Sequence, residues 1–344
     1  MKFTDITNAN ELWQFMTTPS DGLVASMKVL DSDDMMILGG SGKMGKELVG
    51  LVQQADRLNG VQRKIMVAST FSKQEDLNQL MEMGVVCFQG DLAEEPFLDS
   101  LPDAPNVVYM MGFKFGSSDN WTRAFHMNAI VPYLVGRKYP NSSILVFSSG
   151  NPYPHTDRYG PGASEKDALQ PMGIYGWTIV ARESSFRTTA MQHAGQQITI
   201  YRLMYAQHLQ YGVLVDLARM IVNREPISLA MPAVNLISQR DANEVALKSF
   251  NQCNKEGWLV NAAGPVWQVR DIVTALAEHL GQEAIFEGSE SDQALLADDS
   301  KARQAFGEYR DSCPQMIQAA AQWVGSGGYY WNKPTLFGRV RHNY

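Results

Sequence analysis

Six short apolar runs alternate with amphipathic stretches between residues 35 and 204. The runs are MMILGG, KIMVAST, GVVCFQGDL, NVVYMMG, SSILVFSSG and QITIYRLM, and helical patterns such as KQEDLNQLMEMG separate them. Strands that alternate with helices of this length form parallel crossovers, and nearly continuous apolar strands are buried on both faces. The pattern therefore predicts an α/β fold, a doubly wound parallel sheet with helices on both faces.

The pattern changes on both sides of this region. The first 34 residues are mostly polar, with apolar positions at helical spacing. After residue 204, helical patterns dominate and strands become fewer. We interpret 1–34 as an N-terminal helical extension, 35–206 as the sheet domain, and 207–344 as a smaller mixed α/β region on the substrate side with a C-terminal tail. Strands returning to the main sheet are expected around 232–264.

Composition excludes several classes of function. The chain has 344 residues, a formal net charge of -7 and a pI near 5.4. This acidic balance argues against binding to nucleic acid or to an anionic membrane. Three widely spaced cysteines form no disulfide or metal-binding pattern. No apolar run reaches the roughly 18 residues of a spanning helix, and the first residues lack the core of a secretory signal. We expect a cytoplasmic protein.

A glycine-rich turn follows the first predicted strand and opens a helix. Gly39, Gly42 and Gly45 stand three residues apart. In this context the first glycine allows a sharp turn, the second lets the backbone approach a pyrophosphate, and the third lets the helix pack on the sheet. The spacing predicts a Rossmann-type domain that binds a nicotinamide dinucleotide. The same binding segment includes Ser41, Lys43 and Met44.

The end of the second strand bears on the choice of cofactor. A carboxylate there would bind the ribose hydroxyls of NAD and repel the extra phosphate of NADP. The chain instead has Ser69 and Thr70, followed by Lys73. The sequence therefore favours NADP slightly over NAD.

Together with the glycine turn, the motifs GDL at 90–92, SSGNPY at 148–153 and a tyrosine eight residues before Glu183 resemble the extended short-chain dehydrogenase/reductase family. These are NAD-dependent epimerase/dehydratase-like proteins, and the resemblance runs from about residue 35 to 307. It implies that Asp91 contacts adenine with Leu92 beside it. It also implies that Met111 and Gly112 lie along the cofactor.

The resemblance implies a catalytic pair and exposes one departure. Tyr175 would donate or accept the proton, and Ser149 would orient the substrate oxygen. The family's lysine, four residues after the tyrosine, is replaced by Ile179. A free tyrosine has a pKa near ~10, and a nearby ammonium would favour its phenolate. Two interpretations of Lys114 stay open: an exposed loop lysine, or a relocated cation.

Other departures narrow the substrate. Gly150 and Asn151 occupy the positions where sugar dehydratases of this family carry an acidic pair, so water elimination is not expected. The residues after Arg202 lack the Asn and Gly-Pro pattern of nucleotide-sugar enzymes. We therefore expect a free sugar, a sugar acid or a similar polyol.

Two functional hypotheses follow. The first is an NAD(P)-dependent oxidoreductase or epimerase with an atypical active site. The second is a catalytically inactive NAD(P)-binding sensor or structural protein, since loss of the lysine would remove much of the acid–base contribution of about 10²–10⁴-fold. The six histidines show no metal-ligand spacing, and no metal is expected. The aromatic tail at 327–344 suggests a homodimer contact.

Overall fold

The computed structural model describes residues 2–30, 33–333, 335 and 337. At its centre is a parallel sheet of seven strands in the order β3-β2-β1-β4-β5-β7-β11. These strands are β1 (Met35–Leu38), β2 (Ile65–Ser69), β3 (Val86–Gln89), β4 (Asn106–Tyr109), β5 (Ser143–Ser149), β7 (Gln197–Leu203) and β11 (Trp258–Ala262). The predicted doubly wound parallel sheet is confirmed, and the six apolar runs form six of its seven strands.

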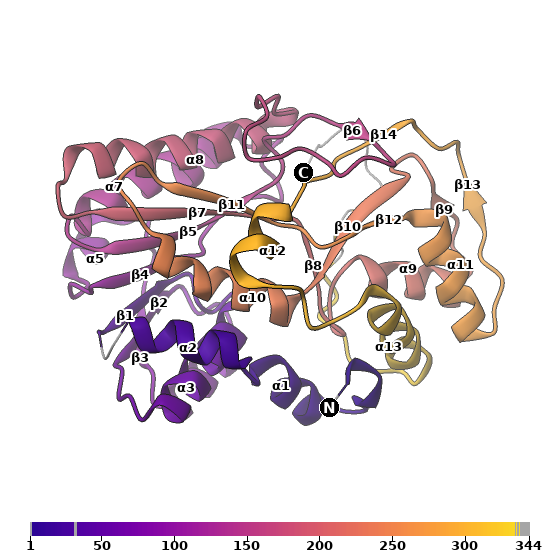
Figure 1. Ribbon diagram of the computed structural model, residues 1–344, viewed down its shortest axis with the longest axis horizontal. Helices are drawn as coiled ribbons and strands as arrows, with labels where there is room; N and C mark the ends of the chain where they lie inside the picture. The colour runs from indigo at the N-terminus through magenta and orange to yellow at the C-terminus, as the bar shows by residue number, and fades with distance from the viewer. Residues whose placement is uncertain (1, 31–32, 334, 336, 338–344) are drawn as a thin grey trace.

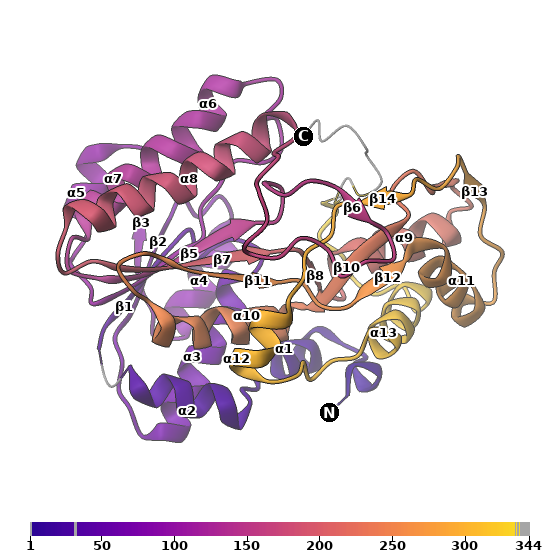
Figure 2. The same ribbon diagram turned by 45° about the horizontal axis from the view of Figure 1, so that its top comes forward.

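Alternate residues of the buried strands supply two separate cores. In β1, Met35 and Ile37 face one core, and Met36 and Leu38 face the other. Figures 1 and 2 show the two helical layers that cover these faces. One layer contains α5 (Glu95–Ser100), α6 (Trp121–Phe125), the π-helix η2 (His126–Ile130), α7 (Val131–Lys138) and α8 (Gly173–Gln192). The other contains α2 (Asp21–Val29), α3 (Gly45–Asn59), α4 (Gln74–Glu82), α10 (Gln239–Lys248), η3 (Ser249–Gln252) and α12 (Ser300–Phe306).

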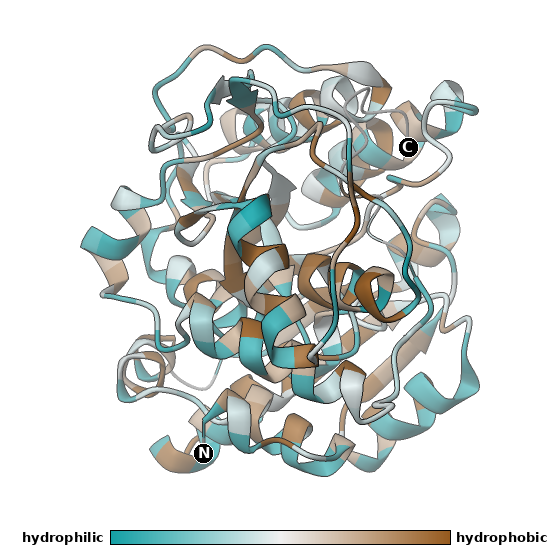
Figure 3. Ribbon diagram, turned by 90° about the vertical axis from the view of Figure 1, so that its right-hand side faces the viewer, coloured by the Kyte–Doolittle hydropathy of each residue, from teal (hydrophilic) through white to brown (hydrophobic). Residues whose placement is uncertain are grey.

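A smaller region lies beyond the carboxyl ends of the central strands, at the right of Figure 1. Its sheet has the order β12-β10-β8 and two short pairs, β13-β9 and β14-β6. Figure 3 views this end and shows hydrophobic and hydrophilic stretches side by side on its helices. The elements are β6 (Thr156–Asp157), β8 (Tyr205–Gln207), α9 (Val213–Val222), β9 (Ile227–Ser228), β10 (Ala233–Ser238), β12 (Val266–Gln268), α11 (Val269–Leu280), β13 (Phe286–Glu287), β14 (Gln293–Ala294) and α13 (Cys313–Gly325).

The N-terminal segment packs on both parts of the molecule. It contains η1 (Phe3–Asp5), α1 (Ala9–Thr17) and α2. Phe3 and Phe15 join the core of the smaller region, whereas Leu23 and Met27 join a core of the central sheet. Within 232–264, β11 pairs with β7 in the main sheet and β10 belongs to the second sheet. Among the described residues, no helix is both long and apolar enough to cross a membrane.

Candidate cofactor and active site

The strand order reverses at β1, which pairs with β2 on one side and β4 on the other. In open parallel sheets this reversal leaves a crevice at the carboxyl ends of the strands. The glycine turn after β1 lies at this place, as the sequence predicted for a dinucleotide site. The segment after β4 borders the same crevice.

The three glycines meet different demands in the turn. Gly39 has a φ of +85°, and a side chain on it would lie 3.0 Å from the Met111 nitrogen. A Cβ on Gly45 would lie 2.2 Å from the carbonyl oxygen of Gly40, so the α3 start packs directly on the turn. A Cβ on Gly42 would meet only the Gly39 oxygen, at 3.3 Å. The open side at Gly42 fits the close approach of a phosphate.

Helix α3 begins beside this open side. Its N-cap residue, Met44, provides no side-chain hydrogen bond to the first turn. Free N–H groups and the helix dipole at such a terminus attract anions. The residues of the turn therefore fit a dinucleotide pyrophosphate.

The residues predicted for the adenosine half lie apart from the catalytic pair. The Ser41 hydroxyl is 2.6 Å from that of Ser69, which ties the turn to the end of β2. Thr70 is exposed. The Asp91 carboxylate accepts a hydrogen bond from the Ala93 nitrogen at 2.9 Å, and Leu92 is buried in a sheet core. Leu92 thus supports this end of the site by packing.

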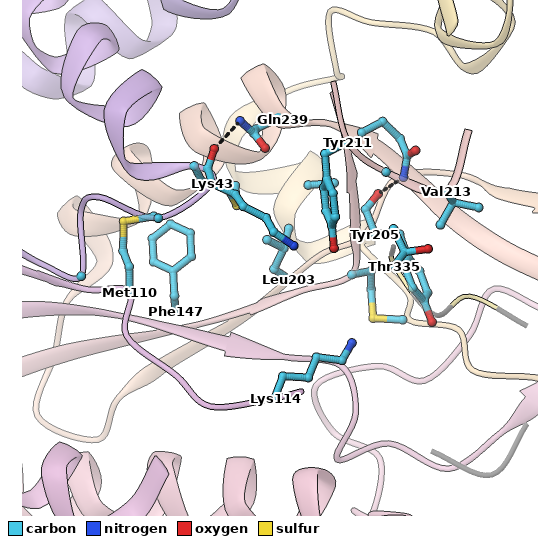
Figure 4. A pocket seen from close by; sticks show the side chains of 17 residues that line it. Lys43, Met110, Lys114, Phe147, Leu203, Tyr205, Tyr211, Val213, Gln239 and Thr335 are labelled. Atoms are coloured by element: carbon cyan, nitrogen blue, oxygen red, sulfur yellow. Dashed lines mark hydrogen bonds between the residues drawn. The ribbon is translucent and has the colours of Figure 1, made fainter. Parts of the chain in front are cut away.

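A cavity of about 310 Å³ opens between the glycine turn and the smaller region. Figure 4 shows the amino groups of Lys43 and Lys114 pointing into it from different sides. Its described lining contains these two lysines and no carboxylate. The apolar and aromatic lining includes Met110, Phe147, Leu203, Tyr205 and Tyr211. The balance of charge favours an anionic ligand.

Both lysines are partly removed from water. The Lys43 ammonium lies 3.4 Å from the centre of the Tyr211 ring. Burial and, to a lesser extent, the charges of Lys333 and Lys114 lower the pKa of Lys43 to about 8, while the Asp216 charge acts in the opposite direction. Burial likewise lowers the pKa of Lys114 to about 8. Binding of an anion would favour the charged form of both groups.

The predicted catalytic pair meets at the edge of the crevice. Ser149 ends β5, and Tyr175 lies in the first turn of α8. Burial raises the pKa of Tyr175, while the Arg182 charge and a hydrogen bond with Ser149 act in the opposite direction. The Ser149 hydroxyl also donates to the Asn151 side chain at 2.9 Å. Buried Ile179 supplies no charge, as its sequence position indicated.

Lys114 connects this pair to the cavity. Its ammonium lies 5.5 Å from the centre of the Tyr175 ring and also lines the cavity. Lys114 is half-buried, so it lies at the site and is not an exposed loop residue. Tyr175, Ser149 and Gly112 are not part of the cavity wall themselves.

The chain after α13 contributes to the wall of the cavity, which the sequence pattern did not predict. Trp331 stacks on His208 with ring centres 4.9 Å apart, and the backbone N–H of Trp331 donates to the backbone carbonyl oxygen of Gln210. The Thr335 hydroxyl donates to Asp216 at 2.6 Å, and Thr335 lines the cavity. The aromatic composition of the tail was the available signal, but it gave no location. The homodimer contact proposed for 327–344 falls partly outside the described residues.

Among the described residues, no group of three or more His, Cys, Asp or Glu side chains is arranged to hold a metal ion.

A buried ion pair links β7 and α8: Arg202 donates to both carboxylate oxygens of Glu183, at 2.8 and 2.6 Å. It holds the helix that carries Tyr175.

No protein-family model and no curated protein sequence matches the chain. Solved structures do. UDP-glucose 4-epimerase from Thermotoga maritima, determined with UDP-glucose, has a TM-score of 0.71 and 17% identity over 86% of this chain and 99% of that one. MoeE5 in complex with UDP-glucose and NAD has a TM-score of 0.67 and 17% identity, with the same coverage.

UDP-glucuronic acid 4-epimerase from Bacillus cereus, in complex with UDP-glucuronic acid and NAD, has a TM-score of 0.68 and 14% identity. The alignment covers 85% of this chain and 99% of the epimerase. At the level of the fold, these neighbours confirm the resemblance to the extended short-chain dehydrogenase/reductase proteins. The chain has the fold of NAD-dependent UDP-sugar epimerases.

Proposed function

We propose that the chain is an NAD(P)-dependent oxidoreductase or epimerase of a sugar, sugar acid or similar polyol. The observation that carries the proposal is the glycine turn, which opens toward a cavity reached by Lys114, beside the Tyr175–Ser149 pair. The dinucleotide phosphates would lie at Gly42 and the start of α3. When bound, the nicotinamide supplies or accepts a hydride.

Side chains of this protein transfer the proton. Ser149 orients the substrate oxygen, and Tyr175 gives or takes the proton. In reduction, the carbonyl carbon would receive a hydride with its two electrons, supplied by the reduced dinucleotide, and the carbonyl oxygen would receive the phenol proton of Tyr175, so that C=O becomes CH–OH. Because burial raises the pKa of Tyr175, the phenol is protonated at neutral pH. We infer that reduction is the easier direction there.

The choice of cofactor and substrate is tested directly. The end of β2 has no carboxylate to repel the NADP phosphate, while two of the structural neighbours contain NAD. These two structures also contain UDP-glucose or UDP-glucuronic acid, whereas this chain lacks the residue pattern expected of nucleotide-sugar enzymes. NADH and NADPH are each mixed with keto-sugars, keto-acids of sugars and UDP-4-keto-sugars, and absorbance is followed at 340 nm.

Two variants separate chemistry from binding. Tyr175→Phe removes only the hydroxyl, so turnover should fall about 10²–10⁴-fold while dinucleotide affinity is retained. Tyr159→Phe, at a tyrosine that is 71% exposed, is the matched control and should leave turnover unchanged. Turnover that survives in Tyr175→Phe would reject the assigned role.

A second function is favoured by one observation, the uncharged and fully buried Ile179. It is a dinucleotide-binding sensor without turnover. This function predicts that NAD or NADP binds and that no substrate changes the absorbance. Turnover above the uncatalysed rate with any substrate of the panel would exclude it.

A further inference from the structure

Arg182 places a guanidinium inside the layer between α8 and the central sheet. Its side chain is almost fully buried, with 4% of the residue exposed. One terminal nitrogen donates to the Phe147 carbonyl at 2.9 Å, and the other donates to the Asn128 side-chain oxygen at 2.6 Å. A Cβ on Gly112 would lie 2.5 Å from the guanidinium, so a glycine makes room for it.

This charge has no carboxylate partner among the described residues within ion-pair distance. Glu183, the next residue, is bound instead by Arg202. The Arg182 Nε is buried and has no hydrogen-bond partner in the described part of the chain. An unpaired buried cation is costly, so its presence suggests that a neighbouring group acquires negative charge during function.

Tyr175 is the neighbour that can do so. Positions 175, 179 and 182 are spaced i, i+4 and i+7 and share one face of α8. Side chains of a helix lean toward its N-terminus, which directs Arg182 toward Ile179 and Tyr175. Among the described groups, Arg182 is the charge that lowers the pKa of Tyr175 against the larger effect of burial.

Hydrogen bonds fix the same region. The Asn128 amide donates to the Thr178 hydroxyl at 3.0 Å, and this hydroxyl donates to the Tyr175 carbonyl at 2.8 Å. Asn128 also bonds both backbone groups of Phe113. It belongs to the π-helix η2, a distortion that is frequent at functional sites. Arg182 is thus held by the residues that position the tyrosine.

We propose that Arg182 is a positioning residue that replaces the lysine missing at Ile179: from one helical turn further along, its buried charge stabilises the Tyr175 phenolate. The proposal rests on the proposed function for the role of Tyr175 in proton transfer. A guanidinium suits the position because it stays charged at all relevant pH values and its fork reaches two acceptors. Lys114, with a pKa of about 8, loses its charge in alkaline solution.

The test follows the ionisation of Tyr175 in the full-length protein without cofactor. Tyrosine ring carbons are labelled with ¹³C, and the Tyr175 signal is assigned by its loss in Tyr175→Phe. Arg182→Met should raise the proton affinity of Tyr175 about tenfold or more. Arg182→Lys should restore much of the wild-type value. Arg187→Met, at a half-buried arginine later on the same helix, is the control and should change nothing.

A charge-return variant separates electrostatics from folding. Arg182→Met combined with Ile179→Lys should bring the proton affinity back toward the wild-type value, which a purely structural role would not do. If Arg182→Met fails to fold, Arg182→Gln keeps the test open, because it removes the charge but keeps a side chain that can hydrogen-bond the Phe147 and Asn128 oxygens. It should raise the proton affinity of Tyr175 about tenfold, and a change within twofold would overturn the proposal.

An Arg182→Met titration of Tyr175 within twofold of the wild-type value, or the absence of any return in the double variant, would overturn the proposal. Cofactor binding is measured separately. A protein that binds no NAD or NADP but shows the Arg182 effect would reject the proposed function and leave the effect of Arg182 on the phenol established.

Discussion

Gly45→Ala perturbs the contact that joins the glycine turn to helix α3. The added Cβ would lie 2.2 Å from the Gly40 oxygen and 2.6 Å from its carbonyl carbon. Real contacts of this kind exceed about 3 Å, so the backbone of the turn or the helix must move. Overpacking of this kind costs roughly 1–3 kcal/mol, and the better helix propensity of alanine offsets at most about 1 kcal/mol.

The same movement displaces the N–H groups that face the proposed phosphate site. Each charge-assisted hydrogen bond lost weakens binding by about 1.5–3 kcal/mol, which is roughly 10- to 150-fold in Kd. Urea unfolding measures the first effect, and calorimetric titration with NAD or NADP measures the second. Both should change in Gly45→Ala.

Gly325→Ala is the matched control. Gly325 ends α13, and a Cβ there meets only a Leu280 methyl group at 3.4 Å. The free energy of unfolding of the Gly325→Ala protein should equal that of the wild type or exceed it by up to about 1 kcal/mol, and its dinucleotide affinity should be unchanged. The reasoning is refuted if Gly45→Ala is as stable as the wild type and binds the dinucleotide equally well.

Three further predictions concern charges around the site. Glu183→Gln should cost roughly 3–5 kcal/mol in urea unfolding because Arg202 is left buried without its counter-charge; a loss below 1 kcal/mol would contradict this. Dinucleotide affinity should fall from pH 7 to pH 9 by about tenfold for each of Lys43 and Lys114, whose pKa of about 8 leaves them mostly neutral at pH 9; a flat profile would reject their part in binding the anionic dinucleotide. Asp216→Ala should speed proteolysis after α13, since it removes the acceptor for the Thr335 hydroxyl and N–H; unchanged cleavage would show that this bond does not hold the segment.

The central sheet could be predicted because its signals are local. Strands buried on both faces require continuous apolar runs, and β1 and β5 show them plainly. The glycine turn is equally local. Gly45 is required by a contact with Gly40, five residues earlier, and Gly39 by a contact with Met111, just after the neighbouring strand β4. The absence of a lysine at Ile179 was also apparent in the sequence, once the resemblance to the family had assigned Tyr175 as its tyrosine.

The cavity could not be predicted, because its wall comes from distant parts of the chain. Tyr211 meets Lys43 across the crevice, and Thr335 joins the cavity wall from the chain after α13. Contacts of this kind depend on tertiary packing and leave no periodic pattern. The aromatic composition of the tail indicated that it packs against another surface, but its position beside the glycine turn could not be predicted from composition.

Arg182 is an intermediate case. Its spacing from Tyr175 and Ile179 places it on their helix face, and that signal was available in the sequence. What the sequence lacked was its burial and its bond to Asn128, because a charged residue on a helix is usually solvated. The sequence therefore offered only Lys114, which follows a strand, as a replacement cation.

The central claim is that a nicotinamide dinucleotide binds over the Gly39–Gly45 turn with its reactive ring beside Tyr175. Its most direct test is calorimetric titration of the full-length protein with NAD, NADH, NADP and NADPH. The account predicts that at least one of them binds with one molecule per chain. Its affinity should fall at least tenfold in Gly45→Ala and stay unchanged in Gly325→Ala. No heat from any of the four at millimolar concentration would contradict it.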